Sequence, residues 1–85
     1  MTFDGAVIKE QGVTFAITVV KPNVLNSPNR EKIQARFSSV FDGLPTVLMA
    51  QDFNGVPKYY GRKDIVNFLA SINMNQIPWK TYTVN

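Results

Sequence analysis

The chain of 85 residues contains no cysteine and no histidine, and these two absences exclude much of catalytic chemistry. Without cysteine there is no disulfide, thiolate nucleophile or thiolate metal site, and without histidine the usual base near neutral pH is missing. The six Asp and Glu residues show no spacing that pairs two of them for acid–base work or gathers them around a metal. We therefore predict that the protein is not an enzyme, and that it has no catalytic residues, no cofactor and no metal.

Long apolar segments are also missing. The longest one, residues 13–20, is interrupted by Thr14 and Thr18 and is far too short to span a bilayer. The first five residues lack the basic and apolar regions of a signal peptide. The sequence thus predicts a single domain over residues 1–85, a cytoplasmic location and no membrane association.

Positive charge is in modest excess, with nine Lys and Arg residues against six Asp and Glu residues and a net charge of +3. The basic residues are spread along the chain in runs of at most two, whereas nucleic-acid-binding proteins usually cluster them on one element. This pattern favours a solvated, mildly basic surface, and nucleic acid stays a possible but less favoured partner.

Apolar periodicity predicts seven elements in the order β-β-α-β-β-α-β. Alternating large apolar residues predict a hairpin of residues 5–10 and 13–20 around Gly12. Helical spacing predicts helices over 28–42, with Ser27 as N-cap, and over 62–72. Residues 46–50 are almost continuously apolar and residues 79–84 alternate, so both segments are expected to be strands.

These elements define an α/β (α+β) fold, a two-layer sandwich with a mixed sheet of about five strands. Because crossovers between parallel strands are right-handed, we expect both helices to cover one face of the sheet. Asn54-Gly55 is typical of a two-residue type I′ turn, and that turn would place Gln51 opposite Lys58 and Ala50 opposite Tyr59.

Residues 58–63 combine aromatic and basic side chains at the start of the second predicted helix. The candidate ligand-binding residues there are Tyr59, Tyr60, Gly61, Arg62 and Lys63. A helix N-terminus and the guanidinium fork of Arg62 suit a phosphate or carboxylate, and aromatic rings can stack a base. The alternative interpretation is structural: one tyrosine packs inward, Gly61 caps the helix and the cations are solvated.

Lys21 and Ser27 precede the first predicted helix and form a second candidate. If both crossovers join parallel strands, the two helix N-termini face one edge of the sheet. Lys21, Ser27, Gly61 and Arg62 would then share one anion site.

The uncovered sheet face is a candidate interface. It would carry Thr14, Thr18, one of Tyr59 and Tyr60, and either Trp79 with Thr81 or Tyr82 with Lys80. Tryptophan and tyrosine are typical interface anchors. The leading hypothesis is a small non-catalytic interaction module that forms a homodimer and binds a protein partner through this face or an edge strand. The alternative is a binder of an anionic small ligand or nucleic acid through residues 58–63.

Overall fold

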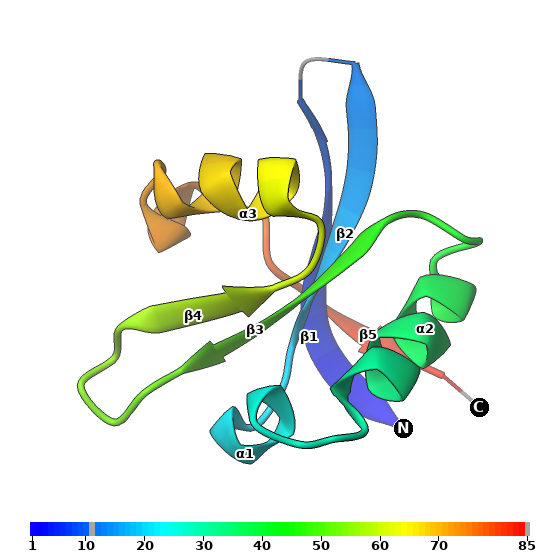
Figure 1. The fold of residues 1–85 in the computed structure, drawn as a ribbon. Coiled ribbons are helices and arrows are strands. Elements are labelled where there is room, and N and C mark those ends of the chain that lie inside the picture. The colour runs from blue at the N-terminus through cyan, green and yellow to red at the C-terminus, as the bar shows by residue number, and fades with distance from the viewer. Residues whose placement is uncertain (11, 85) are drawn as a thin grey trace.

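A computed structural model of the protein describes residues 1–10 and 12–84 (Figure 1). The elements follow in the order β1 (Thr2–Glu10), β2 (Val13–Val19), α1 (Pro22–Leu25), α2 (Arg30–Val40), β3 (Thr46–Gln51), β4 (Pro57–Tyr60), α3 (Lys63–Ala70), the 3-10 helix η1 (Met74–Gln76) and β5 (Lys80–Thr83). The predicted fold class, a mixed sheet of five strands with helices packed on it, is confirmed.

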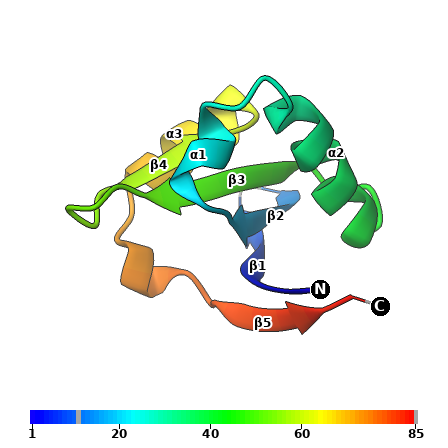
Figure 2. The ribbon, with the colours of Figure 1, turned by 90° about the horizontal axis from the view of Figure 1, so that it is seen from below.

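The five strands form one twisted sheet in the order β4-β3-β2-β1-β5 (Figures 1 and 2). β2 and β3 are parallel, and the three other neighbouring pairs are antiparallel. The crossover between β2 and β3 runs through α1 and α2. β4 and β5, with four residues each, form the two edges of the sheet.

The helices α2 and α3 pack against opposite faces of the sheet, which corrects the expectation that they share a face. Phe15 and Ile17 of β2 pack with residues of α3, whereas Ala16 between them packs with Phe37 and Phe41 at the end of α2. Successive side chains of a strand point to opposite faces, so the two helices lie on different sides. Figure 1 shows α3 and α2 on the two sides of the strands.

Strand direction explains why the handedness argument fails for α3. β4 is antiparallel to β3, while β5 is antiparallel to β1 and therefore runs parallel to β2 and β3. The strands before and after α3 are thus antiparallel to each other and stand at opposite edges of the sheet. The right-handed rule governs connections between parallel strands only, and it leaves the face of α3 undetermined.

Each face has its own apolar cluster. The larger one joins the sheet to α3 and contains Phe15, Ile17, Val47, Met49, Ile65 and Leu69. The smaller one is aromatic: the Phe3 ring stacks on Tyr82 with a centroid separation of 5.4 Å and meets Phe37 edge-on at 5.0 Å. Such ring pairs add about 0.5–1.5 kcal/mol beyond the burial of apolar area.

The β3–β4 hairpin differs from the predicted type I′ turn by one residue of register. Ala50 lies opposite Lys58 and Gln51 opposite Pro57. Gly55 has a φ of 81°, and it is the only residue of the Asn54-Gly55 pair with positive φ. Hydrogen bonds from Gly55 N to Asp52 O and from Asp52 N to Val56 O indicate a three-residue loop with a bulge at Gly55. This shift places Lys58 and Tyr60 on the face of Ala50, and Tyr59 on the other face.

The first predicted helix is shorter in the structure than the expected 28–42, because α2 begins only at Arg30. Pro22 opens an additional short helix, α1, in a segment for which no helix was predicted. Ser27 is not the N-cap of α2. Its hydroxyl oxygen accepts a hydrogen bond from Asn29 N at 3.1 Å, within the turn between the two helices.

Candidate functional site

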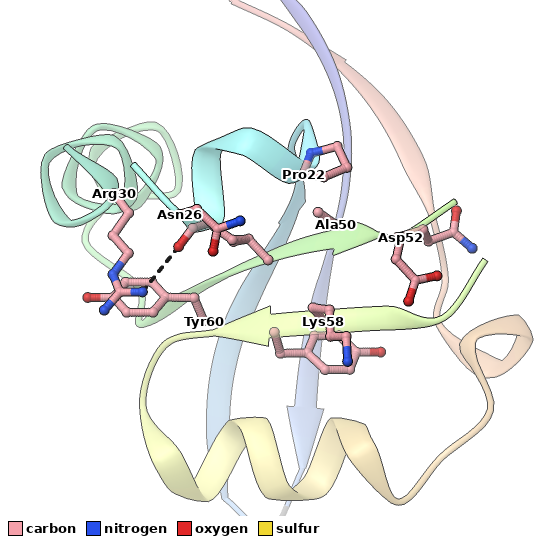
Figure 3. Close-up of a pocket in the computed structure, with 10 residues that line it drawn as sticks. Pro22, Asn26, Arg30, Ala50, Asp52, Lys58 and Tyr60 are labelled. Atoms are coloured by element: carbon pink, nitrogen blue, oxygen red, sulfur yellow. Dashed lines mark hydrogen bonds between the residues drawn. The ribbon is translucent and has the colours of Figure 1, made fainter. Parts of the chain in front are cut away.

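A surface pocket of about 410 Å³ lies between α1 and the β3–β4 hairpin (Figure 3). We call it the α1–β4 pocket. It is lined by Pro22, Leu25, Asn26, Arg30, Ala50, Gln51, Asp52, Lys58, Tyr59 and Tyr60. Ala50 and Lys58 are neighbours across the β3–β4 ladder, and the small Ala50 side chain leaves room beneath α1. The volume falls in the range of ordinary small-ligand sites.

Arg30 forms one end of the α1–β4 pocket and is held in place by two contacts. Its guanidinium carbon lies 4.3 Å from the centre of the Tyr60 ring, in a cation–π arrangement, and its Nη1 donates a hydrogen bond of 3.1 Å to Leu25 O. The Tyr60 hydroxyl lies 3.4 Å from Glu31 Oε1. Since Arg has five N–H donors and only one is engaged in a hydrogen bond within the described residues, the others are free to meet a ligand.

Lys58 adds a second cation, and Asp52 lies at the other end of the pocket from Arg30 (Figure 3). Asp52 Oδ1 accepts hydrogen bonds from Asn54 N at 2.9 Å and Val56 N at 3.0 Å, which ties this carboxylate to the hairpin loop. The charged side chains that line the pocket are therefore the cations Arg30 and Lys58 and the Asp52 carboxylate, which is hydrogen-bonded to the hairpin loop. The pocket combines apolar walls with a net positive charge, which suits an organic anion.

The predicted ligand residues do not form a single site. Of the stretch 58–63, only Lys58, Tyr59 and Tyr60 line the α1–β4 pocket. Tyr59 lies on the α3 side of the sheet, where burial raises the pKa of its hydroxyl.

The Arg62 guanidinium is already bound to a carboxylate of the chain itself. Its Nε and Nη2 donate hydrogen bonds of 2.7 Å each to the two carboxylate oxygens of Asp64. These bonds lower the pKa of Asp64 to about 2. Lys63 is exposed at the start of α3.

The proposed sharing of one anion site by Lys21, Ser27, Gly61 and Arg62 is contradicted by the strand directions. Lys21 and Ser27 follow the end of β2, where Val20 N donates to Met49 O near the end of β3. Gly61 instead lies against Thr46 and Val47 at the beginning of β3, because β4 is antiparallel to β3. The two groups therefore sit at opposite ends of the strands.

The four predicted interface residues do not form a bare sheet face either. Thr18 is fully buried, and Thr14 is half-buried on the same face of β2. Trp79 packs against the larger cluster and donates from Nε1 to Met74 O, whereas Tyr82 belongs to the aromatic cluster of the other face.

Arg30, Asn26, Ala50 and Asp52 also line the pocket, and no motif in the sequence marks them as site residues. Arg30 lies exposed at the start of α2. The sequence pattern does not reveal that Tyr60, 30 positions further along the chain, is its neighbour.

Comparison of the chain with protein-family models, with curated proteins and with solved structures gave no match. In the part of the chain that the structure describes, no helix has the length and apolar character needed to cross a membrane. Residues 1–10 and 12–84 contain no group of three or more carboxylates that could hold a metal ion.

Proposed function

We propose that the protein is a small non-catalytic binding module whose α1–β4 pocket takes a small organic anion. The observation that carries the proposal is the Arg30 guanidinium, stacked on Tyr60 and anchored to Leu25 O at the pocket wall, with Lys58 on the adjoining strand. A pre-positioned guanidinium loses little conformational entropy when it binds a carboxylate or phosphate.

The apolar part of the lining supports an organic ligand over a bare ion. Pro22 and Leu25 offer carbon surface, and the half-buried Tyr60 ring stands beside the Arg30 guanidinium. A compact molecule with one flat apolar body and one anionic group matches both halves of the pocket. Nucleic acid fits less well, because the basic residues follow one another along the chain in runs of at most two and are not clustered on one element.

Amide chemical shifts can test this proposal directly. Phenyl phosphate, with an apolar ring and an anionic group, should shift the amides of Arg30, Lys58 and Tyr60 in a saturable way. Inorganic phosphate and benzyl alcohol, each carrying only one of the two features, should bind more weakly. Shifts that are absent from these three residues, or that centre on Arg62 and Lys63, would refute the pocket as the site. A short single-stranded oligonucleotide that shifts them more strongly would favour nucleic acid.

A second candidate function, self-association in the cytoplasm and binding of a protein partner, is favoured by a different observation. β5 pairs only with Thr2–Gly5, which leaves the second half of β1 without a neighbour on that side among the described residues. Unpaired strand edges readily accept another strand. The proposal predicts a weak, concentration-dependent homodimer, which light scattering coupled to size-exclusion chromatography can detect.

A further inference from the structure

The free edge of β1 presents backbone groups ready to pair. Met1 exchanges both backbone hydrogen bonds with Val84, at 2.8 Å each. In an antiparallel ladder such doubly bonded pairs alternate, so the odd residues of β1 direct their N–H and C=O groups toward β5. The last pair is Gly5 with Lys80. The groups of Val7 and Lys9 therefore point past the end of β5, where the described residues provide no strand.

Hollows lie on both faces of this free edge. One, of about 390 Å³, is lined by Val7 together with Pro78, Trp79, Lys80 and Tyr82. The other, of about 490 Å³, joins residues 7–10 of β1 to Phe68, Ile72, Gln76 and Pro78. An added strand places alternate side chains on the two faces, so both hollows would receive them. The upper part of β1 indeed stands clear of β5 in Figure 1.

We infer that this edge binds a second copy of the chain, with the two β1 strands antiparallel and centred on Ile8. This inference gives a surface to the self-association proposed above. In this register Val7 faces Lys9 of the second copy, and Lys9 faces Val7 of the second copy. Together the two strands have four free N–H groups and four free C=O groups, and these two pairs bond all of them. Ile8 then meets its counterpart, and Val7, which is 42% exposed, gains cover from the stem of Lys9.

Two other registers, centred on Lys9 and on Val7, also keep the corresponding faces of the two sheets on the same side, and both are less favourable. Centring on Lys9 sets two like charges directly opposite, which destabilises a strand pair. Centring on Val7 requires backbone groups of Gly5, which already pair with Lys80. In the register centred on Ile8, Ala6 faces Glu10 and no like charges are opposite. The free segment carries Lys9 and Glu10 and is neutral, so two copies approach without the repulsion that the net charge of +3 implies elsewhere.

Two substitutions at Val7 with opposite charge test this register. Val7→Glu places a carboxylate opposite Lys9 of the second copy, twice by symmetry, and should tighten the dimer by roughly fivefold. Val7→Lys places like charges there and should weaken it by a similar factor. Both variants replace the same exposed apolar residue, so a merely apolar association would be weakened by both. Circular dichroism checks that each variant is folded.

The dissociation constants are measured by analytical ultracentrifugation up to about 1 mM chain, a range suited to a small interface. Opposite effects of the two variants, with slowed hydrogen exchange at the Val7 and Lys9 amides at high concentration, support the inference. If both variants weaken the dimer equally, or if neither changes its dissociation constant, the contact lies elsewhere. That result would overturn the free edge of β1 as the interface and would leave self-association itself intact. A monomer at every concentration would overturn both. None of these outcomes touches the α1–β4 pocket, which lies at the opposite edge of the sheet.

Discussion

Two threonines lie in the interior of the sheet, and they differ in hydrogen bonding. Thr18 is fully buried, and its Oγ1 has no hydrogen-bond partner among the described residues. Thr46 is 4% exposed, and its Oγ1 donates to Leu44 O at 3.0 Å. A buried hydroxyl without a partner costs about 1–3 kcal/mol, whereas a satisfied one contributes about 1 kcal/mol.

The pair of threonines gives a matched prediction. Thr18→Val should raise the free energy of unfolding by about 1 kcal/mol and the Tm by about 4–8 °C, because it removes only the unpaired hydroxyl from a β-branched side chain. Thr46→Val should lower the free energy of unfolding by about 1 kcal/mol, because the bond to Leu44 O is lost. Chemical denaturation measures both variants. Equal effects in the two would show that the Thr18 hydroxyl is satisfied in solution.

The ion pair of Arg62 and Asp64 is predicted to make the free energy of unfolding depend on pH. The hydrogen bonds from Arg62 lower the pKa of Asp64 in the folded state to about 2, below the ordinary value near 4 in the unfolded chain. The stabilising contribution is therefore fully present above pH 4 and is lost as the pH falls from about 4 to 2. Both side chains are half-exposed, so solvent screens this contribution.

Carboxyl chemical shifts check the assignment. The Asp64 carboxyl should titrate with a midpoint of about 2, and Arg62→Gln should move that midpoint up toward the ordinary range. A midpoint that stays unchanged in Arg62→Gln would mean that another group holds the pKa down.

Among the elements, the β3–β4 hairpin shows how a local detail sets the faces of a strand. The Asn54-Gly55 pair predicts a hairpin at this point and the hairpin is present, but its loop is not the two-residue type I′ turn expected. The register was wrong by one residue because Asp52 Oδ1 binds two loop N–H groups and favours a three-residue loop. That single shift decides that Lys58 and Tyr60, and not Tyr59, share a face with Ala50.

Asp52 is therefore predicted to hold the loop. Asp52→Ala removes the acceptor of two N–H bonds and should destabilise the hairpin by about 1–2 kcal/mol, with faster hydrogen exchange in β4. Asp52→Asn keeps an oxygen at this position and serves as the control, with a smaller loss. If the β4 amides of Asp52→Ala exchanged hydrogen at the rates of the unsubstituted protein, the carboxylate would have no role in fixing the register.

Helix ends were predicted with less success than helix faces. Phe37 and Phe41, four positions apart within the predicted helix over 28–42, lie on one helix face and pack in the aromatic cluster, as helical spacing predicts. The short helix α1 was missed and the start of α2 was placed too early: Pro22 opens α1, whereas Pro28 was expected to open the long helix. Both prolines carry the same local signal, and only tertiary packing determines where the long helix begins.

At the scale of the whole molecule, the alternation of apolar residues predicts the fold class, the order of the strands along the chain and the parallel β2–β3 crossover. It could not predict the faces of the two helices, because they depend on β5 pairing with β1 rather than with a strand beside β4. Partner choice among edge strands is a long-range property that local patterns do not encode. The shared anion site was wrong for a separate reason: β4 is antiparallel to β3, so α3 begins at the opposite end of the strands from α1.

The same topology brings the pocket together. α1 follows β2 and reaches over β3 to β4, so Arg30 and Lys58, 28 positions apart in the chain, line one hollow. The free edge of β1 lies across the sheet from this pocket. Ligand binding and strand pairing are therefore predicted to be independent, and saturation with phenyl phosphate should leave the dimer dissociation constant unchanged within error in ultracentrifugation. A shift of that constant would show that the two regions communicate.

The most direct measurement is the affinity for phenyl phosphate in a matched pair of variants, determined by isothermal titration calorimetry. Lys58→Gln removes a cation of the α1–β4 pocket, and Lys63→Gln removes an exposed cation five positions further along. We expect Lys58→Gln to weaken binding about tenfold, the effect of losing one charge-assisted hydrogen bond, and Lys63→Gln to bind like the unsubstituted protein. Equal affinities in all three proteins, or a loss confined to Lys63→Gln, would contradict this expectation.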